Sequence, residues 1–279
     1  MTAHVIDRQG DQRGARTVER NAVLWATNAK KNGARGRLND LSLLWSDEEG
    51  PESISVAAGP SLADDIEDLQ KMRQGRELCV VDAALKFVLE AGLTPDYVVT
   101  SDASEKVLAM FDGLSIPKTT VLVANVIANP SVVDAWTGGP VHWFVMANQY
   151  YSVNHKRMMQ EIHALVSGVG TKLVPGGNVS SVALSFLLSV RNSRKVHLFG
   201  HDFSWKTDMY AGAAFKHLEA ERIAEETVAG TIREVKNTRG ETVLTNQSLA
   251  RYGAWHERAA RLAAGRVQNN TSSTILNIG

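Results

Sequence analysis

Cysteine is almost absent from this sequence, since Cys79 is the single cysteine among 279 residues. One cysteine excludes an internal disulfide and a zinc site built from cysteines. Because Cys79 lies inside an apolar run, residues 78–81, we expect a buried thiol with a structural role. The compartment is therefore expected to be reducing.

Long apolar runs and an excess of one charge are missing as well. No stretch approaches the roughly 18 consecutive apolar residues of a membrane span, and residues 1–14 are polar rather than typical of a signal sequence. The 30 basic residues balance the 30 acidic ones, so no overall charge attracts nucleic acid or a membrane. We expect a cytoplasmic protein without a membrane span.

Several catalytic signatures are also missing. The glycine-containing segments match neither the Gly-x-Gly-x-x-Gly fingerprint nor a Walker P-loop, which argues against a standard dehydrogenase or P-loop kinase. There is no Gly-x-Ser-x-Gly elbow, which disfavours a hydrolase. No His-Glu-x-x-His or similar spacing points to zinc. We expect no zinc, haem or flavin.

The chain does contain an alternation of strand-like and helix-like segments after about residue 50. Such an alternation predicts an α/β fold, with a Rossmann-like, mostly parallel sheet and helices on both of its faces. The expected strands are residues 56–58, 77–81, 97–100, 120–124, 142–146 and 195–199, and the expected helices include 64–73, 83–91 and 154–166.

The composition divides the chain into two expected parts. Residues 1–50 are polar and locally basic and are expected to form a helical appendage, followed by a Rossmann-like transferase domain over residues 51–279. Residues 205–245 are expected to form a lid or rim inserted after the last core strand. Within it, Asn237-Thr238-Arg239-Gly240 is typical of a hairpin turn.

Ligands of such sheets bind beyond the carboxyl ends of the strands. The candidate site residues are therefore those that follow the expected strands or begin the next helix. They are Gly59, Pro60, Ser61, Asp82, Asp102, Asn125, Gly176, Gly177, Asn178, Ser180, Gly200, His201 and Asp202.

The turn Gly59-Pro60-Ser61 has two interpretations. It is either a phosphate site, in which glycine lets a ligand approach and the N–H groups of a helix start attract the anion, or an ordinary corner between a strand and a helix. A second glycine-containing helix start, Gly176-Gly177-Asn178, favours the first interpretation, because two such turns would hold the two ends of a nucleotide diphosphate or nucleotide sugar.

Carboxylates and a histidine supply the candidate chemistry. Asp102 is the strongest candidate to bind a ligand hydroxyl or a hydrated Mg²⁺. Asp82 is either part of this site or the N-cap of the following helix. His217 lies in the polar segment after the last core strand, where a general base would meet an incoming acceptor.

The order of these motifs resembles the central domain of the bacterial motility accessory factor family. These flagellin glycosyltransferases are related to the bacterial sialyltransferases and to the archaeal 6-hydroxymethylpterin diphosphokinase group. The resemblance covers roughly residues 20–279, and the motifs that carry it are residues 58–62, 81–85, 92–102, 175–180 and 199–203.

This resemblance implies a sialyltransferase-like (GT-A-like) fold and a donor site made by Gly59, Pro60, Ser61, Gly176, Gly177, Asn178, Gly200 and Asp202, with His217 as the base. The chain departs from its relatives at two places. Ala58 stands where sialyltransferases have asparagine, and Thr100-Ser101-Asp102-Ala103 stands where the diphosphokinases have Thr-Asp-Leu-Asp. We therefore favour glycosyl transfer over diphosphate transfer.

The function expected is transfer of a sugar from a nucleotide-sugar donor to an acceptor hydroxyl. Two alternatives stay open: a Mg-ATP-dependent diphosphokinase that acts on a 6-hydroxymethylpterin-like alcohol, with Asp102 as metal ligand, and a non-catalytic nucleotide-binding module. The expected partner is a nucleotide sugar or nucleotide. The acceptor, whether a protein hydroxyl, a glycan or modified DNA, and homo-oligomer formation are left open.

Overall fold

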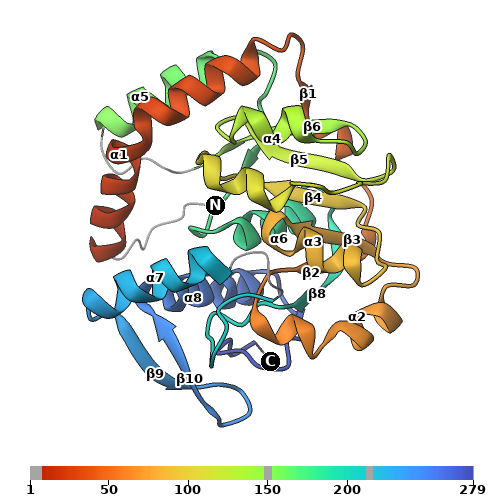
Figure 1. Cartoon of the computed structure of the whole chain (residues 1–279). Helices are drawn as coiled ribbons and strands as arrows, with labels where there is room; N and C mark the ends of the chain where they lie inside the picture. The colour runs from red at the N-terminus through yellow and green to blue at the C-terminus, as the bar shows by residue number, and fades with distance from the viewer. Residues whose placement is uncertain (1–7, 148–152, 212–215, 279) are drawn as a thin grey trace.

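A computed structural model describes residues 8–147, 153–211 and 216–278 of the chain (Figure 1). Its helices and strands alternate from β2 to β8, as the sequence predicts. The α-helices are α1 (Arg8–Gly33), α2 (Ile66–Met72), α3 (Asp82–Glu90), α4 (Pro130–Ala135), α5 (Val153–Ala164), α6 (Val179–Ser189), α7 (Lys216–Val228) and α8 (Gln247–Leu262). Three short 3₁₀ segments are η1 (Leu41–Leu44), η2 (Pro60–Ala63) and η3 (Glu105–Met110).

Within the described residues, nine strands form one sheet whose pairs are all parallel. The order is β1-β6-β5-β4-β3-β2-β8-β11, and β7 pairs with β6. These strands are β1 (Asn39–Asp40), β2 (Gly50–Val56), β3 (Glu77–Val81), β4 (Tyr97–Thr100), β5 (Val121–Asn125), β6 (Val141–Met146), β7 (Lys172–Leu173), β8 (Ser193–Phe199) and β11 (Val267–Asn269).

The strand order creates one switch point, between β2 and β8. From β2 the chain steps outward through β3, β4, β5 and β6, and then returns through α6 to place β8 on the other side of β2. Because crossovers between parallel strands are right-handed, this reversal puts α6 on the opposite face of the sheet from α2 and α3. The predicted parallel sheet with helices on both faces is therefore confirmed, and the carboxyl ends of β2 and β8 form its switch point.

The turn after β2 differs from its prediction. The strand runs from Gly50 to Val56 rather than over residues 56–58, and Pro60 begins the four-residue 3₁₀ segment η2 instead of an α-helix. The α-helix α2 follows only at Ile66. Asp202, which is remote in sequence, binds Ser61 through both carboxylate oxygens and holds this segment in place.

Helix α1 confirms the helix expected near the N-terminus and lies beside α5 (Figure 1). Its residues Val18, Trp25 and Ala29 are buried in a hydrophobic cluster with side chains of β4, β5 and β6. The division of the chain near residue 50 stays a prediction, but this helix shares a core with the sheet.

The predicted hairpin near the C-terminus is confirmed. Strands β9 (Ile232–Lys236) and β10 (Thr242–Asn246) pair antiparallel. Trp205 is buried and exchanges two backbone hydrogen bonds with Leu244, at 2.8 and 2.7 Å. The Thr245 hydroxyl donates to the Phe203 carbonyl at 2.7 Å. These bonds attach the hairpin to the loop after β8, and a role of residues 205–245 as a lid or rim stays a prediction.

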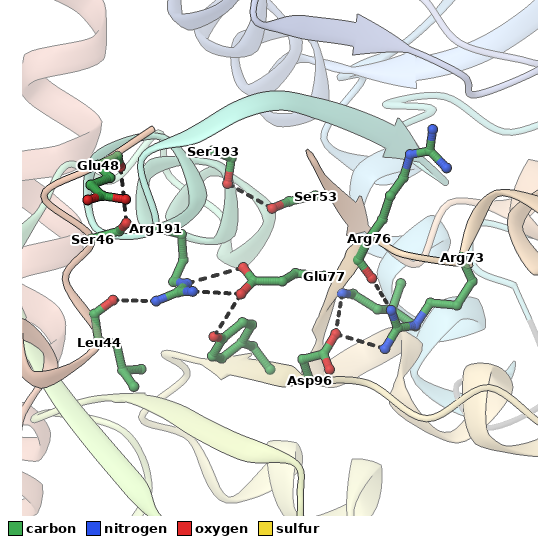
Figure 2. A network of polar contacts seen from close by, with 12 residues as sticks. Leu44, Ser46, Glu48, Ser53, Arg73, Arg76, Glu77, Asp96, Arg191 and Ser193 are labelled. Atoms are coloured by element: carbon green, nitrogen blue, oxygen red, sulfur yellow. Dashed lines mark hydrogen bonds and ion pairs between the residues drawn. The ribbon is translucent and has the colours of Figure 1, made fainter. Parts of the chain in front are cut away.

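A polar network closes the opposite, amino-terminal end of the central strands (Figure 2). Glu77 receives two hydrogen bonds from the Arg191 guanidinium, at 2.6 and 3.1 Å, and one from the Tyr97 hydroxyl at 3.3 Å. Arg191 also donates to the Leu44 carbonyl at 2.6 Å. This network joins β3 and β4 to the turn between α6 and β8, far along the chain from both.

Candidate functional site

In a parallel sheet, the carboxyl ends of all strands lie at the same edge. The predicted site residues, which follow these strands or begin the next helix, therefore lie along this edge. They fall into two groups there. One group lies at the switch point of β2 and β8, together with the start of α6. The other lies at the ends of β3, β4 and β5.

The turn Gly59-Pro60-Ser61 is clamped by Asp202 from the loop after β8. One carboxylate oxygen of Asp202 accepts a hydrogen bond from the Ser61 N–H, and the other accepts one from the Ser61 hydroxyl, both at 2.9 Å. A Cβ on Gly59 would lie 2.1 Å from an Asp202 oxygen, and one on Gly200 would lie 2.2 Å from the Ala57 carbonyl oxygen. Close approach of two loops therefore explains both glycines.

The carboxyl group of Asp202 is almost fully buried. Burial raises its pKa to about 7, although the two hydrogen bonds from Ser61 act in the opposite direction. Near neutral pH, Asp202 is thus divided between its charged and neutral forms. An anion that approached Ser61 would favour the neutral form of Asp202, so the Asp202 carboxylate would take up a proton when the anion binds.

The second turn, Gly176-Gly177-Asn178, begins helix α6. The Asn178 side chain caps this helix by accepting a hydrogen bond from the Ser181 N–H at 3.1 Å. A Cβ on Gly176 would lie 2.4 Å from the Trp255 ring, and one on Gly177 would lie 2.6 Å from the Tyr252 ring. Gly177 also has a φ of +101°, which favours glycine. The aromatic face of α8 therefore sets the shape of this turn.

Two buried histidines lie between strand β2 and the start of helix α6. His256 Nδ1 lies 2.8 Å from the Tyr252 carbonyl oxygen, which only accepts, so this nitrogen carries the hydrogen. The other nitrogen, Nε2, then accepts from the Ser180 hydroxyl at 3.4 Å. The ring centroids of His201 and His256 are 5.3 Å apart, and Nε2 of His201 is 3.2 Å from the Ser55 hydroxyl oxygen.

Both imidazoles are neutral near physiological pH. Burial lowers the pKa of His256 to about 4, and burial together with the neighbouring His256 holds the pKa of His201 well below its usual range. These histidines join the α6 turn to the loop that carries Asp202 without adding charge there.

The second group surrounds the end of β3 and β4. Asp82 is buried, accepts hydrogen bonds from the Thr100 hydroxyl at 2.9 Å and the Ala83 N–H at 2.8 Å, and begins helix α3. Burial raises the pKa of Asp82 to about 7, and the nearby charge of Asp102 contributes in the same direction. Asp102 itself is exposed and accepts from the Ser104 N–H at 2.8 Å.

Asn125 completes this group at the end of β5. Its side chain donates to the Ser101 hydroxyl at 3.0 Å, which links the loops that follow β4 and β5. Asp82, Asp102 and Asn125 therefore share one end of the sheet, where Asp102 is the carboxylate that faces solvent.

Comparison with known proteins identifies the family. A family model described as 6-hydroxymethylpterin diphosphokinase MptE-like matches residues 25–208, more than half of the chain. The chain belongs to this MptE-like family. A comparison with curated protein sequences gave no match.

A solved structure shares the fold. The MptE-like chain superposes on the MAf glycosyltransferase from Magnetospirillum magneticum AMB-1 with a TM-score of 0.66 at 18% sequence identity. The match covers 91% of this chain but only 37% of that protein. The likeness confirms the α/β fold over nearly the whole chain.

Some predicted features of this MptE-like site lie outside what the structure describes. His217 falls in the first turn of α7, and its side chain is not among those described. Among the described residues, no three histidine, cysteine, aspartate or glutamate side chains gather in a way that could hold a metal ion.

A cavity of about 400 Å³ lies elsewhere, beside α2. Its lining residues are Asp68, Lys71, Met72, Arg76, Phe199 and Asn270, and neither glycine turn is among them. In the part of the chain that the structure describes, no helix is both long and apolar enough to cross a membrane.

Two pairs of residues near the site were not predicted from the sequence. Tyr252 and Trp255 cover the turn before α6, but nothing in their spacing along the chain shows which turn they cover. Asn28 and Asn32 fell within the expected appendage, although both are buried against the loops of the second group. Their i, i+4 spacing on a helix was the one available signal.

Proposed function

We propose that this MptE-like protein binds a nucleotide donor at the switch point of its sheet and transfers the donor's sugar to an acceptor hydroxyl. One observation carries the proposal. The turns Gly59-Pro60-Ser61 and Gly176-Gly177-Asn178 follow or precede elements at the same sheet edge, and His201 and His256 pack together between Ser55 of β2 and Ser180 of α6. Two turns of this kind at one edge suit the two ends of a nucleotide sugar.

In the proposed reaction, the N–H groups of the first turn of α6 and the helix dipole bind the donor phosphate. The acceptor oxygen attacks the anomeric carbon, the bond from that carbon to the phosphate oxygen breaks, and the acceptor proton passes to a base, for which we propose His217. The charge that develops on the leaving phosphate is stabilised by the helix start.

We propose a sugar as the transferred group because the chain shares its fold, over 91% of its length, with a MAf glycosyltransferase. Because that identity is 18% and that protein is much longer, the donor sugar and the acceptor are not inferred from it.

A second candidate is transfer of diphosphate from Mg-ATP to the hydroxyl of a pterin-like alcohol, with release of AMP. The description of the family favours it, and so does the proximity of Asp82 and Asp102, because oxygen ligands suit Mg²⁺. Asp102 would then hold the metal, which neutralises charge on the phosphates.

Isothermal titration tests the proposal with CMP, UDP, GDP, ATP and their sugar derivatives, each with and without Mg²⁺. Binding of a nucleotide sugar followed by release of its nucleotide supports sugar transfer. AMP release from Mg-ATP and hydroxymethylpterin supports the second candidate instead. Absence of binding for the whole set would refute both, and binding without turnover would indicate a nucleotide-binding module.

Two variants separate the candidates. Asp102→Asn removes one carboxylate oxygen from an exposed position and should weaken Mg²⁺-dependent ATP binding while sparing metal-independent binding of a nucleotide sugar. Asp112→Asn, also at an exposed carboxylate, is the matched control. His217→Ala should remove sugar transfer and leave donor affinity intact; unchanged turnover would exclude His217 as the base.

A further inference from the structure

Two asparagines of α1 satisfy backbone groups in loops that belong to the candidate site. The Asn28 amide nitrogen donates to the Ala103 carbonyl oxygen at 3.0 Å and to the Ile127 carbonyl oxygen at 3.1 Å. Ala103 follows β4, and Ile127 follows β5. One side chain therefore bridges the two loops.

Asn32, one helical turn further along, binds the second of these loops at two more points. Its amide nitrogen donates to the Val126 and Ala128 carbonyl oxygens, at 2.9 and 3.0 Å. The exposed fractions of Asn28 and Asn32 are 4% and 0%. Both N–H groups of each amide are therefore used, out of reach of solvent.

The same two loops carry Asp102 and Asn125 and are joined to each other. The Asn129 N–H donates to the Asp102 carbonyl oxygen at 2.9 Å, and Asn125 donates to the Ser101 hydroxyl at 3.0 Å. The conformation that presents the Asp102 carboxylate therefore depends on contacts between the loops. Asn28 and Asn32, on helix α1, bind the backbone carbonyls of both loops.

Asparagine suits this task because each carbonyl it serves lies in a loop rather than in a strand ladder. A buried carbonyl without a donor is costly, and among the described residues only Ala103 has a second side-chain donor, Asn129 at 3.4 Å, so truncation of either asparagine would favour loop conformations that turn these groups toward water. A helix that packs on the sheet through Trp25 and Ala29 keeps the two amides at fixed positions.

We propose that Asn28 and Asn32 are positioning residues, which fix the loops after β4 and β5 so that Asp102 faces the ligand. The inference rests on the proposed function for its ligand, a nucleotide. Helix α1 thereby becomes part of the candidate site, although neither asparagine touches the ligand.

A double-mutant cycle tests the proposal, with Mg²⁺-ATP and Mg²⁺-UDP as probes in isothermal titration. Asn28→Ala and Asn32→Ala are each expected to weaken binding about tenfold, as loss of supporting residues around a ligand site commonly does. In an Asp102→Asn background the same changes should weaken binding less than about twofold, because the residue being positioned is already lost. An equal factor in both backgrounds would show a merely structural role and overturn the proposal.

Asn21→Ala is the matched control, because Asn21 lies on the same helix and its amide donates to the Thr17 carbonyl of that helix. It should leave both affinities unchanged. Hydrogen exchange provides a second readout that needs no ligand. Amides of residues 101–104 and 126–129 should exchange faster in Asn28→Ala and Asn32→Ala than in Asn21→Ala, while the central strands keep their protection.

The outcomes separate the two proposals. If the unmodified protein binds no nucleotide or nucleotide sugar of the titration set, the proposed function fails, and the exchange measurement still decides whether the asparagines fix the loops. Unchanged exchange in both loops would overturn the inference whatever the titrations show. If Asn32→Ala fails to fold, Asn28→Ala provides the same test, because the Asn28 amide by itself contacts both loops.

Discussion

Replacement of Asp202 by asparagine is expected to stabilise the protein at neutral and alkaline pH. A protonated carboxyl group accepts a hydrogen bond at one oxygen and donates one from the other. A carboxamide does the same, so it accepts from the Ser61 N–H and donates to the Ser61 hydroxyl. The variant therefore keeps both contacts of the Asp202 side chain, which are 2.9 Å long, and removes its charged form.

The size of the effect follows from the pKa of Asp202, which burial raises from its usual 3.8 to about 7. Between these values the folded protein holds a proton that the unfolded chain has released, so stability falls as pH rises through this window. The slope is about 1.4 kcal/mol per pH unit, and the whole shift corresponds to about 4 kcal/mol. Relative to the native protein, Asp202→Asn should gain about 3 kcal/mol between pH 5 and pH 8.

Urea unfolding at pH 5, 6, 7 and 8 measures this difference, with Asp82 titrating alike in both proteins. Asp64→Asn, at an exposed position of the neighbouring turn, controls for the loss of one negative charge. A difference between Asp202→Asn and the native protein that stays constant from pH 5 to pH 8 would refute the raised pKa. A control that shows the same trend would refute the assignment to Asp202.

Three further stability predictions can be checked by chemical unfolding. Gly59→Ala should cost more than about 2 kcal/mol, because its Cβ would lie 2.1 Å from a carboxylate oxygen, whereas Gly170→Ala, with nothing within 4 Å, should stay within about 0.5 kcal/mol. Glu77→Gln should cost about 3 kcal/mol by leaving a largely buried guanidinium without its counter-charge, and Arg194→Ala, at a half-exposed pair, under about 1 kcal/mol. Trp205→Ala should cost about 3 to 5 kcal/mol and loosen the hairpin, seen as faster exchange of its amides.

Much of the sheet could be predicted from the sequence because its strands are buried on both faces. The strands predicted over residues 77–81 and 97–100 have the same bounds as β3 and β4 in the structure. A short apolar run between polar segments fits a buried strand better than a helix. The two-residue strands β1 and β7 could not be predicted, because a pair of residues carries no period.

The candidate site was less predictable, since its contacts join distant residues. Gly59 suggested close approach of a ligand, but the group that approaches it is a carboxylate 143 positions further along the chain, in Asp202. No local pattern names that partner. In the same way, an asparagine on a polar helix is typical of a solvated face, and only the packing of α1 shows that Asn28 and Asn32 are buried.

The position of β2 has a consequence for how the chain is made. Its neighbour β8 is joined to it by the hydrogen bond between Ser53 and Ser193, which are 140 residues apart. At ordinary rates of translation, roughly ten to thirty seconds separate the synthesis of these strands. During that interval, β3 to β6 can assemble beside β2, whose other side stays an open edge, the kind that pairs with foreign strands. Chains interrupted before β8 should therefore aggregate, and the nascent protein is expected to depend on a chaperone until its central strand is covered.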